Sequence, residues 1–201
     1  MRTLEELGEF GPTVHCGSIL LPATQEEDNL NYLKTIRNEV MGLDWISKKS
    51  ARHEYFMSHE ERVYSYGNRN TGDESYNSKP FSPRVSELCD IINEFILDTK
   101  FNVCFLNKYD NEQQHLGWHS DDFDGMDPDE PIGVVSFGAS REIWVKPKDE
   151  KGIVPPDQRI MLDEGSLFVM PAGYQDTHLH KIPKHDRPCD YRISLTFRTF
   201  L

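Results

Sequence analysis

The second half of the chain is a succession of short segments rich in β-branched and aromatic residues. Six of them have the composition of strands: 101–109, 132–137, 142–145, 159–162, 166–170 and 191–197. Turn-forming residues separate them, most clearly Asp163-Glu164-Gly165 and Pro171-Ala172-Gly173. Many short strands joined by such turns predict an antiparallel β-sandwich in this half.

Two helices are expected ahead of these strands. Residues 28–46 carry apolar residues at helical spacing, with Asp28 or Asn29 as an N-terminal cap. Residues 86–99 show the same spacing, and Pro83 stands just before them, where a proline is tolerated. Residues 1–25 predict an extended lead-in with one strand. The expected fold class is therefore α+β, with both helices backing the sandwich.

Length and composition suit one domain, residues 1–201, with the helices in 1–100 and the sandwich in 101–201. No apolar run approaches the ~20 residues of a membrane span, and the N-terminus lacks a signal-peptide core. We therefore expect a cytoplasmic or nuclear monomer with no membrane partner. The four cysteines form no Cys-x-x-Cys pair, which favours reduced thiols over a zinc knuckle.

The net charge of −12 counts against broad, nonspecific binding of nucleic acid, which depends on a basic surface. This net charge does not exclude a local basic groove. The basic residues that would line such a groove are Lys48, Lys49, Arg52, Arg62, Arg69, Lys79 and Arg141. Taken singly, the pattern favours a solvated surface charge over a phosphate contact for each of these residues.

His119-Ser120-Asp121 is the strongest candidate for a metal site. Residues two apart on a strand point the same way, so an imidazole and a carboxylate would face one point. A histidine from 178 or 180 would complete a set of two histidines and one carboxylate, and strand spacing alone allows either. That set suits non-haem Fe(II) oxygenases. A zinc hydrolase also uses such ligands, and an isolated His-x-Asp pair is common on protein surfaces.

Arg192 and Arg198 lie at even spacing on the last predicted strand and therefore share a face. Arginines on a strand commonly pair with surface acids. Near a metal site, however, two inward guanidinium groups require an anionic partner, because an unpaired buried charge is costly. A carboxylate gripped by both nitrogens of a guanidinium meets that requirement.

The order and spacing of five segments resemble the AlkB family of 2-oxoglutarate- and Fe(II)-dependent dioxygenases. The segments are Asn107-Lys108-Tyr109, Gly117-Trp118-His119-Ser120-Asp121-Asp122, PIGVVSFG at 131–138, His180-Lys181-Ile182-Pro183 and RISLTFR at 192–198. The resemblance runs from about residue 64 to residue 200. It implies a double-stranded β-helix (jelly roll) and the cofactors Fe(II), 2-oxoglutarate and O2.

The resemblance also implies a role for each matching residue. His119, Asp121 and His180 would be the catalytic metal ligands, with His180 preferred over His178. Arg192 would hold the distal carboxylate of 2-oxoglutarate with help from Tyr109, Asn107 would hold its keto-acid end, and Arg198 would lie near the metal-bound carboxylate. Ser194 stands where the family more often has asparagine.

The activity implied is oxidative demethylation of alkylated bases in DNA or RNA, with release of formaldehyde, succinate and CO2. The expected partner is a single strand, because a base must leave its stack to react. The N-terminal part would supply the nucleotide-recognition lid. The candidate substrate-binding residues are Tyr64, Tyr66, Trp118, Phe123 and Arg141.

Two alternatives stay open at the level of sequence. Phe123 stands where family members that act on nucleic acid often carry an acid, and the chain is acidic. Both features favour a hydroxylase or demethylase of a protein or small molecule. A nucleic-acid-binding module with a degenerate metal site is the other alternative, and the intact ligand set counts against it.

Overall fold

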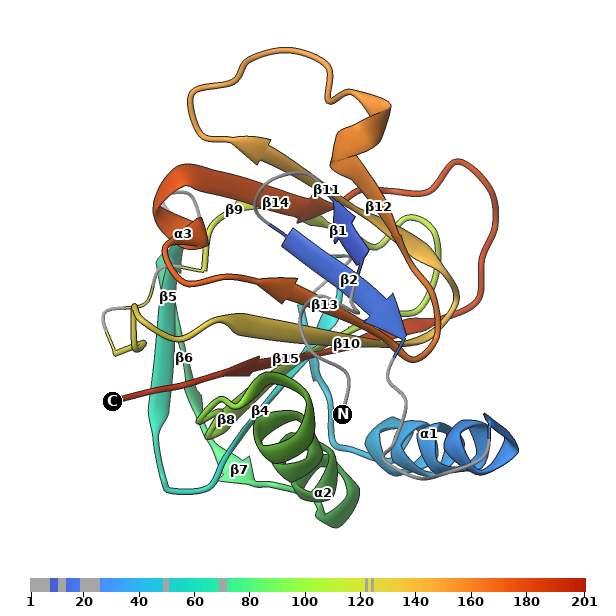
Figure 1. Ribbon diagram of the computed structural model, residues 1–201, viewed down its shortest axis with the longest axis vertical. Coiled ribbons are helices and arrows are strands. Elements are labelled where there is room, and N and C mark those ends of the chain that lie inside the picture. Colours follow the sequence, from blue (N-terminus) through green and yellow to red (C-terminus); the bar gives the residue numbers. More distant parts are fainter. Residues whose placement is uncertain are drawn as a thin grey trace.

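The structure is a computed structural model that describes residues 8–10, 14–18, 26–48, 51–68, 72–121, 123 and 125–201. It has two mainly antiparallel sheets, a separate hairpin and two longer helices at one side (Figure 1). The α+β class expected from the sequence is confirmed. None of the helices in the described ranges has the length and apolar character needed to cross a membrane.

The larger sheet has the strand order β1-β2-β13-β10-β15-β8-β4-β3, and β7 pairs with β4 in parallel. Its strands are β1 (Gly8–Phe10), β2 (Val14–Ser18), β13 (Ser166–Met170), β10 (Ile132–Gly138), β15 (Arg192–Arg198), β8 (Val103–Tyr109), β4 (His53–Ser58), β3 (Ile46–Ser47) and β7 (Lys79–Pro80). Strands from both halves of the chain contribute, since β4 pairs with β8 and β2 with β13. The boundary expected at residue 100 therefore does not separate this sheet from the N-terminal part of the chain, because strands from both sides of it belong to the sheet.

The smaller sheet has the order β12-β11-β14-β9, and a hairpin of two strands stands apart from both sheets. The sheet consists of β12 (Arg159–Leu162), β11 (Arg141–Pro147), β14 (His178–Ile182) and β9 (Leu116–His119); the hairpin consists of β5 (Val63–Asn68) and β6 (Gly72–Asn77). The 3-10 helix Pro156–Gln158 precedes β12, and α3 (Tyr174–Thr177) precedes β14. Strands β4, β5 and β6 were not expected from the sequence.

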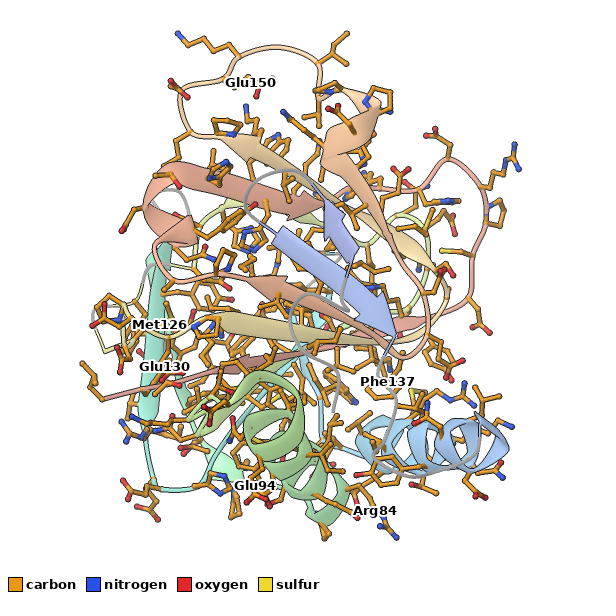
Figure 2. The ribbon with its side chains drawn as sticks, viewed as in Figure 1. Arg84, Glu94, Met126, Glu130, Phe137 and Glu150 are labelled. Carbon is orange, nitrogen blue, oxygen red and sulfur yellow. The ribbon has the colours of Figure 1, made fainter. Side chains whose placement is uncertain are left out.

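Alternation along the central strands separates a helix side from a cavity side. On β15, Ile193, Leu195 and Phe197 are fully buried in a core shared with α1 (Glu26–Met41) and α2 (Pro83–Ile91). Figure 2 shows Phe137 of β10 on the side of the sheet that faces α1. The other side faces the smaller sheet across a second core that includes Val134, Ile143, Ile160 and Phe168.

Both expected helices are present, with different ends. The first ends at Met41 rather than residue 46, and Leu43 and Trp45 after it still pack against the core. The second begins at Pro83, earlier than expected, with proline in its first turn. It continues as a π-helix, Ile92–Leu97, and ends at Asp98, which has a left-handed backbone with φ of 53°. The described residues of the lead-in form two strands, β1 and β2, rather than one.

Candidate metal and co-substrate site

A cavity of about 780 Å³ opens between the two sheets and the β5–β6 hairpin. Polar side chains line it from β8, β9, β14 and β15, and aromatic side chains line it from the hairpin. Its wall includes Arg52, Tyr64, Tyr66, Phe105, Asn107, Tyr109, Trp118, His119, Asp121, Phe123, His180, Arg192, Ser194 and Arg198. Almost every residue that the sequence assigned to the site is therefore brought to one cavity.

His119, Asp121 and His180 form a cluster whose ligand atoms lie within 4.8 Å of one another. His119 and His180 are register partners on β9 and β14, and their ring centroids are 4.1 Å apart. Asp121 comes two residues after the end of β9. Its backbone N–H donates to Oε1 of Gln175 at 2.8 Å. Gln175 thus fixes the ligand segment from α3, and sequence reasoning missed it.

The two histidines differ in how their rings are held. Nδ1 of His119 lies 2.9 Å from the carbonyl oxygen of Gly117, so it carries the proton and leaves Nε2 as the ligand atom. His180 is buried, and its Nδ1 has no hydrogen-bond partner among the described residues. Burial lowers the pKa of His119 and lowers that of His180 to about 3, so both rings are neutral and able to bind a metal.

Asp121 is held ionised by Arg198. Burial by itself would raise the pKa of this carboxyl group, but the positive charge and the hydrogen bond of Arg198, together with the neighbouring His180 and His119, outweigh that effect and hold the pKa well below its usual range. Nη2 of Arg198 donates to Oδ2 of Asp121 at 2.7 Å, and both side chains are nearly buried. Arg198 therefore touches a candidate metal ligand directly.

His178 lies outside this cluster. Its ring stacks on Tyr174 with centroids 4.8 Å apart, and its Nδ1 lies 2.8 Å from Oγ1 of Thr177. The choice that the sequence left open is thus settled geometrically, because the structure brings His180 and not His178 to His119 and Asp121. An irregularity in the pairing between β14 and β9 follows His180 directly.

Arg192 is buried with unused donors. Its Nη2 donates to Oγ of Ser136 at 3.0 Å, whereas its Nε and Nη1 have no partner within the described ranges. Burial lowers its pKa to about 10, so it remains charged at neutral pH. A buried cation with two free N–H groups at a cavity wall fits an incoming carboxylate. Nε and Nη1 of Arg198 likewise have no hydrogen-bond partner among the described residues.

Asn107, Tyr109 and Ser194 lie next to these arginines in register. Tyr109 faces Arg192, and Asn107 faces Ser194, across the β8–β15 pair. Oδ1 of Asn107 accepts a hydrogen bond from Nε of Arg52 at 3.0 Å. Arg52 also pairs with Glu54, a fully buried carboxylate that accepts hydrogen bonds from the hydroxyls of Tyr66 and Tyr76.

From the sequence, Arg52 was expected only as one of the basic residues of a groove, and no role was expected for Glu54. The signal was the alternation in HEYFMS at 53–58, where Glu54 and Phe56 share one side of β4. A glutamate inside a short strand with aromatic neighbours indicates a buried, paired acid.

The aromatic wall contains three of the candidate substrate residues, Tyr64, Tyr66 and Phe123. Tyr64 is buried among Phe56, Phe105 and Phe200, with the ring of Phe123 edge-on at 5.1 Å. Tyr66 is partly exposed and stacks on Tyr76 with centroids 5.8 Å apart. Tyr64 is therefore largely occupied by core packing, whereas Tyr66 and Phe123 have more surface at the cavity.

Trp118 and Arg141 have different surroundings from those expected. Trp118 contributes to the cavity rim, but its ring is contacted by Lys146 and Lys181 of neighbouring strands. Arg141 is 1% exposed and lies outside the cavity wall. Its guanidinium donates to the backbone carbonyls of Gln114 and Pro183. We therefore do not retain Arg141 as a substrate contact, because its donors already hold the backbone beside β14.

The donor set fits the group that a ferrous, 2-oxoglutarate-dependent enzyme needs. His119, Asp121 and His180 would hold Fe(II) from one side and leave positions open. The free nitrogens of Arg192 would hold the far carboxylate of a dicarboxylic co-substrate. Such a centre supplies oxidation of a substrate carbon by O2, coupled to decarboxylation of 2-oxoglutarate.

Comparisons with known proteins agree with this geometry. A family model described as the 2OG-Fe(II) oxygenase superfamily matches residues 20–198. DNA oxidative demethylase ALKBH2 of Mus musculus is 34% identical over 127 residues, which cover 61% of this chain and 53% of the relative. Alpha-ketoglutarate-dependent dioxygenase alkB homolog 3 of Homo sapiens is 35% identical over 104 residues, which cover 49% and 36%. The aligned region thus spans about half of these relatives or less.

A solved structure described as that of OsALKBH1 matches with a TM-score of 0.57 at 15% identity. The match covers 96% of this chain and 99% of the other, and it shows a shared fold. The double-stranded β-helix is the fold that the matched family implies. The match to this family model begins at residue 20, well before the segments 107–109, 117–122, 131–138, 180–183 and 192–198 that carry the resemblance. The chain therefore belongs to the 2OG-Fe(II) oxygenase superfamily, and within it is similar to the AlkB homologues.

Proposed function

We propose that this protein is an Fe(II)- and 2-oxoglutarate-dependent dioxygenase that demethylates alkylated bases in single-stranded DNA or RNA. One observation carries the proposal. The cavity that holds the ligand cluster and the arginines is also lined by the aromatic residues Tyr64, Tyr66 and Phe123. A flipped base needs flat apolar surfaces beside it and a reactive centre in front of it.

Each part of the cavity has a role in this proposal. The ligand cluster binds Fe(II), and Asn107, Tyr109, Arg192, Ser194 and Arg198 bind 2-oxoglutarate. Tyr66 and Phe123 contact the base, while Tyr64 supports them from the aromatic core. The products are succinate, CO2, formaldehyde and the unmodified base. The similarity to ALKBH2, which is named a DNA oxidative demethylase, supports the choice of a nucleic-acid substrate.

A protein or small-molecule substrate is the second candidate, and two observations favour it. The net charge is −12, and Phe123 puts an apolar ring at the cavity. The two candidates differ in what must enter the cavity. A base needs a flanking sugar-phosphate chain at the cavity rim, whereas a small molecule does not.

The test is reconstitution without oxygen, using Fe(II) and 2-oxoglutarate, followed by addition of oxygen and a panel of methylated oligonucleotides. The panel covers DNA and RNA, single and double strands. Mass spectrometry scores the loss of a methyl group, and formaldehyde is measured in parallel. Demethylation of at least one single-stranded oligonucleotide is expected. Turnover of 2-oxoglutarate without loss of methyl groups from any oligonucleotide would shift the proposal to the second candidate.

A further inference from the structure

The outer face of the smaller sheet carries a row of alternating cations and indoles. Guanidinium Cζ of Arg159 lies 4.5 Å from the ring centroid of Trp144, and Nζ of Lys181 lies 4.2 Å from the same ring. Nζ of Lys181 is also 4.8 Å from the ring of Trp118, and Nζ of Lys146 is 5.0 Å from it. We call these five residues the cation–indole row.

Sheet register explains why these residues meet. Trp144 is the direct partner of Arg159 on β12 and of Lys181 on β14. Side chains alternate across a strand, so Trp144 and Lys146 point away from their inward neighbours Ile143 and Val145. The row therefore crosses all four strands of this sheet, on the side away from α1 and α2 (Figure 1).

None of the three cations in the row pairs with a carboxylate in the part of the chain that the structure describes. Arg159 donates to the carbonyl oxygen of Val154, and Lys146 donates to the carbonyl oxygen of Glu150. Glu142 shares this face, but its Oε2 accepts the indole N–H of Trp144. Burial, and then the charges of Lys146 and Arg159, lower the pKa of Lys181. A bound polyanion would relieve this crowding of like charges.

The row reaches the site already described. Trp118 lies at the rim of the cavity and also contacts two of the cations. Three gaps between strands of about 4.8 Å make the row ~14 Å long, which is enough to span more than one phosphate of an extended strand. On a chain with a net charge of −12, three cations held rigidly by two indoles are a local exception.

We propose that the cation–indole row binds the phosphodiester backbone of the single strand whose modified base occupies the cavity. The inference rests on the proposed function for the position of that base. Cation–π contacts fix the ammonium and guanidinium groups before binding, so less conformational entropy is lost when phosphates dock. The row carries no base specificity, because phosphate contacts position a strand without identifying its sequence.

Fluorescence anisotropy tests the row on the metal-loaded protein with 2-oxoglutarate under nitrogen. The probes are a methylated trinucleotide, which fills the cavity and little more, and a 12-nucleotide single strand with the same central lesion. The variants are Lys181→Gln, Arg159→Gln and Lys181→Arg. Lys100→Gln is the matched control, because Lys100 is an exposed lysine after the π-helix and lies outside the row.

Lys181→Gln and Arg159→Gln should each weaken binding of the 12-mer about three- to tenfold at low salt and leave trinucleotide binding unchanged. The slope of log K against log salt should become shallower by roughly 0.7 for each phosphate of the single strand that a variant no longer neutralises. Lys181→Arg should retain affinity, and Lys100→Gln should behave as wild type. Unchanged trinucleotide binding by Lys181→Gln also shows that its weaker binding of the 12-mer is not a folding defect.

The possible results separate this inference from the proposed function. Unchanged 12-mer affinity and salt slope in both glutamine variants would show that the row does not bind the phosphodiester backbone. The proposed demethylation would not be contradicted by that result. Displacement of the 12-mer by inorganic polyphosphate at an equal concentration of phosphate would show a general anion site and would overturn it too. Loss of 12-mer binding in the glutamine variants would support the row even if no methyl group were removed, and in that case the proposed function alone would fail.

Discussion

Nε of Arg52 donates a hydrogen bond to Oδ1 of Asn107 at 3.0 Å, and this contact joins two parts of the cavity wall. Asn107 lies on β8 beside the co-substrate arginines, whereas Arg52 pairs with Glu54 beneath the tyrosines of the hairpin. Because Arg52 occupies the amide oxygen, the amide N–H group of Asn107 is left to face the cavity. One guanidinium thus orients the proposed co-substrate contact Asn107 and supports the aromatic wall.

Arg52→Met should destabilise the fold and weaken 2-oxoglutarate binding together. It leaves Glu54 buried without its arginine, and breaking a buried pair in this way costs roughly 3–5 kcal/mol. Urea unfolding measures the loss of stability. The double variant Arg52→Met/Glu54→Gln should recover part of it, because a neutral amide can still accept from Tyr66 and Tyr76. A double variant that loses the sum of the two single effects would refute the coupling.

Replacing His180 by alanine should abolish turnover and weaken binding of Fe(II), while His178→Ala should retain both. His180 lies in the ligand cluster, and His178 stacks on Tyr174 outside it. Metal affinity measured under nitrogen, with circular dichroism as the check on folding, separates the two. An active His180→Ala would place the third ligand elsewhere.

Asp121 should be tested as asparagine rather than alanine. Arg198 is 4% exposed and pairs with this carboxylate at 2.7 Å. Asp121→Ala would leave a buried guanidinium unpaired and should therefore lower the melting temperature. Asp121→Asn keeps an oxygen that can accept from Arg198, so it should abolish turnover with a smaller loss of stability. Equal melting temperatures for the two variants would mean that the pair contributes little to the fold.

Arg192→Met should weaken 2-oxoglutarate binding about ten- to a hundredfold, because hydrogen bonds to charged groups contribute roughly 1.5–3 kcal/mol. Binding of Fe(II) should be unchanged. The metal-loaded protein without 2-oxoglutarate should be as stable as wild type or more so, since the buried guanidinium has unpaired nitrogens before the acid binds. Thermal shift with and without 2-oxoglutarate reports both effects. A full shift in the variant would exclude Arg192 as the carboxylate contact.

Tyr66→Ala should lower oligonucleotide turnover by about ten- to a hundredfold, because stacking on an aromatic ring contributes roughly 1–3 kcal/mol per base. Uncoupled consumption of 2-oxoglutarate should persist. Tyr66→Phe is the matched control: it keeps the ring and loses only the hydroxyl that donates to Glu54. Tyr66→Phe should therefore retain most of the turnover. Equal losses in the two variants would assign Tyr66 to the hydrogen-bond network rather than to the base.

Local pattern determined much of the fold. Strands at 159–162 and 166–170 have the bounds that composition and turn residues predicted, because each is short and ends at a clear turn. The pattern located the ends of the helices less well. Apolar spacing continues past Met41 through Leu43 and Trp45, which pack on the same core without being helical. β6 lacked a signal, since Asp73-Glu74-Ser75 is polar throughout, and β5 offered only a short one, the alternation of Tyr64 and Tyr66 with Ser65.

For the site, the sequence by itself determined which residue types were present and which of them share a strand face. Arg192, Ser194 and Arg198 all reach the cavity from β15 because the period of a strand is two. Strand spacing left His178 and His180 open, and the family resemblance preferred His180; the tertiary structure supplies the physical reason, because the choice depends on how β14 pairs with β9. The tertiary structure also removed Arg141 from the set of candidate site residues and added Arg52, Glu54 and Gln175 to it. Their roles depend on hydrogen bonds between strands and helices far apart in the sequence; a local pattern can indicate that Glu54 is buried, but it does not encode which residues it pairs with.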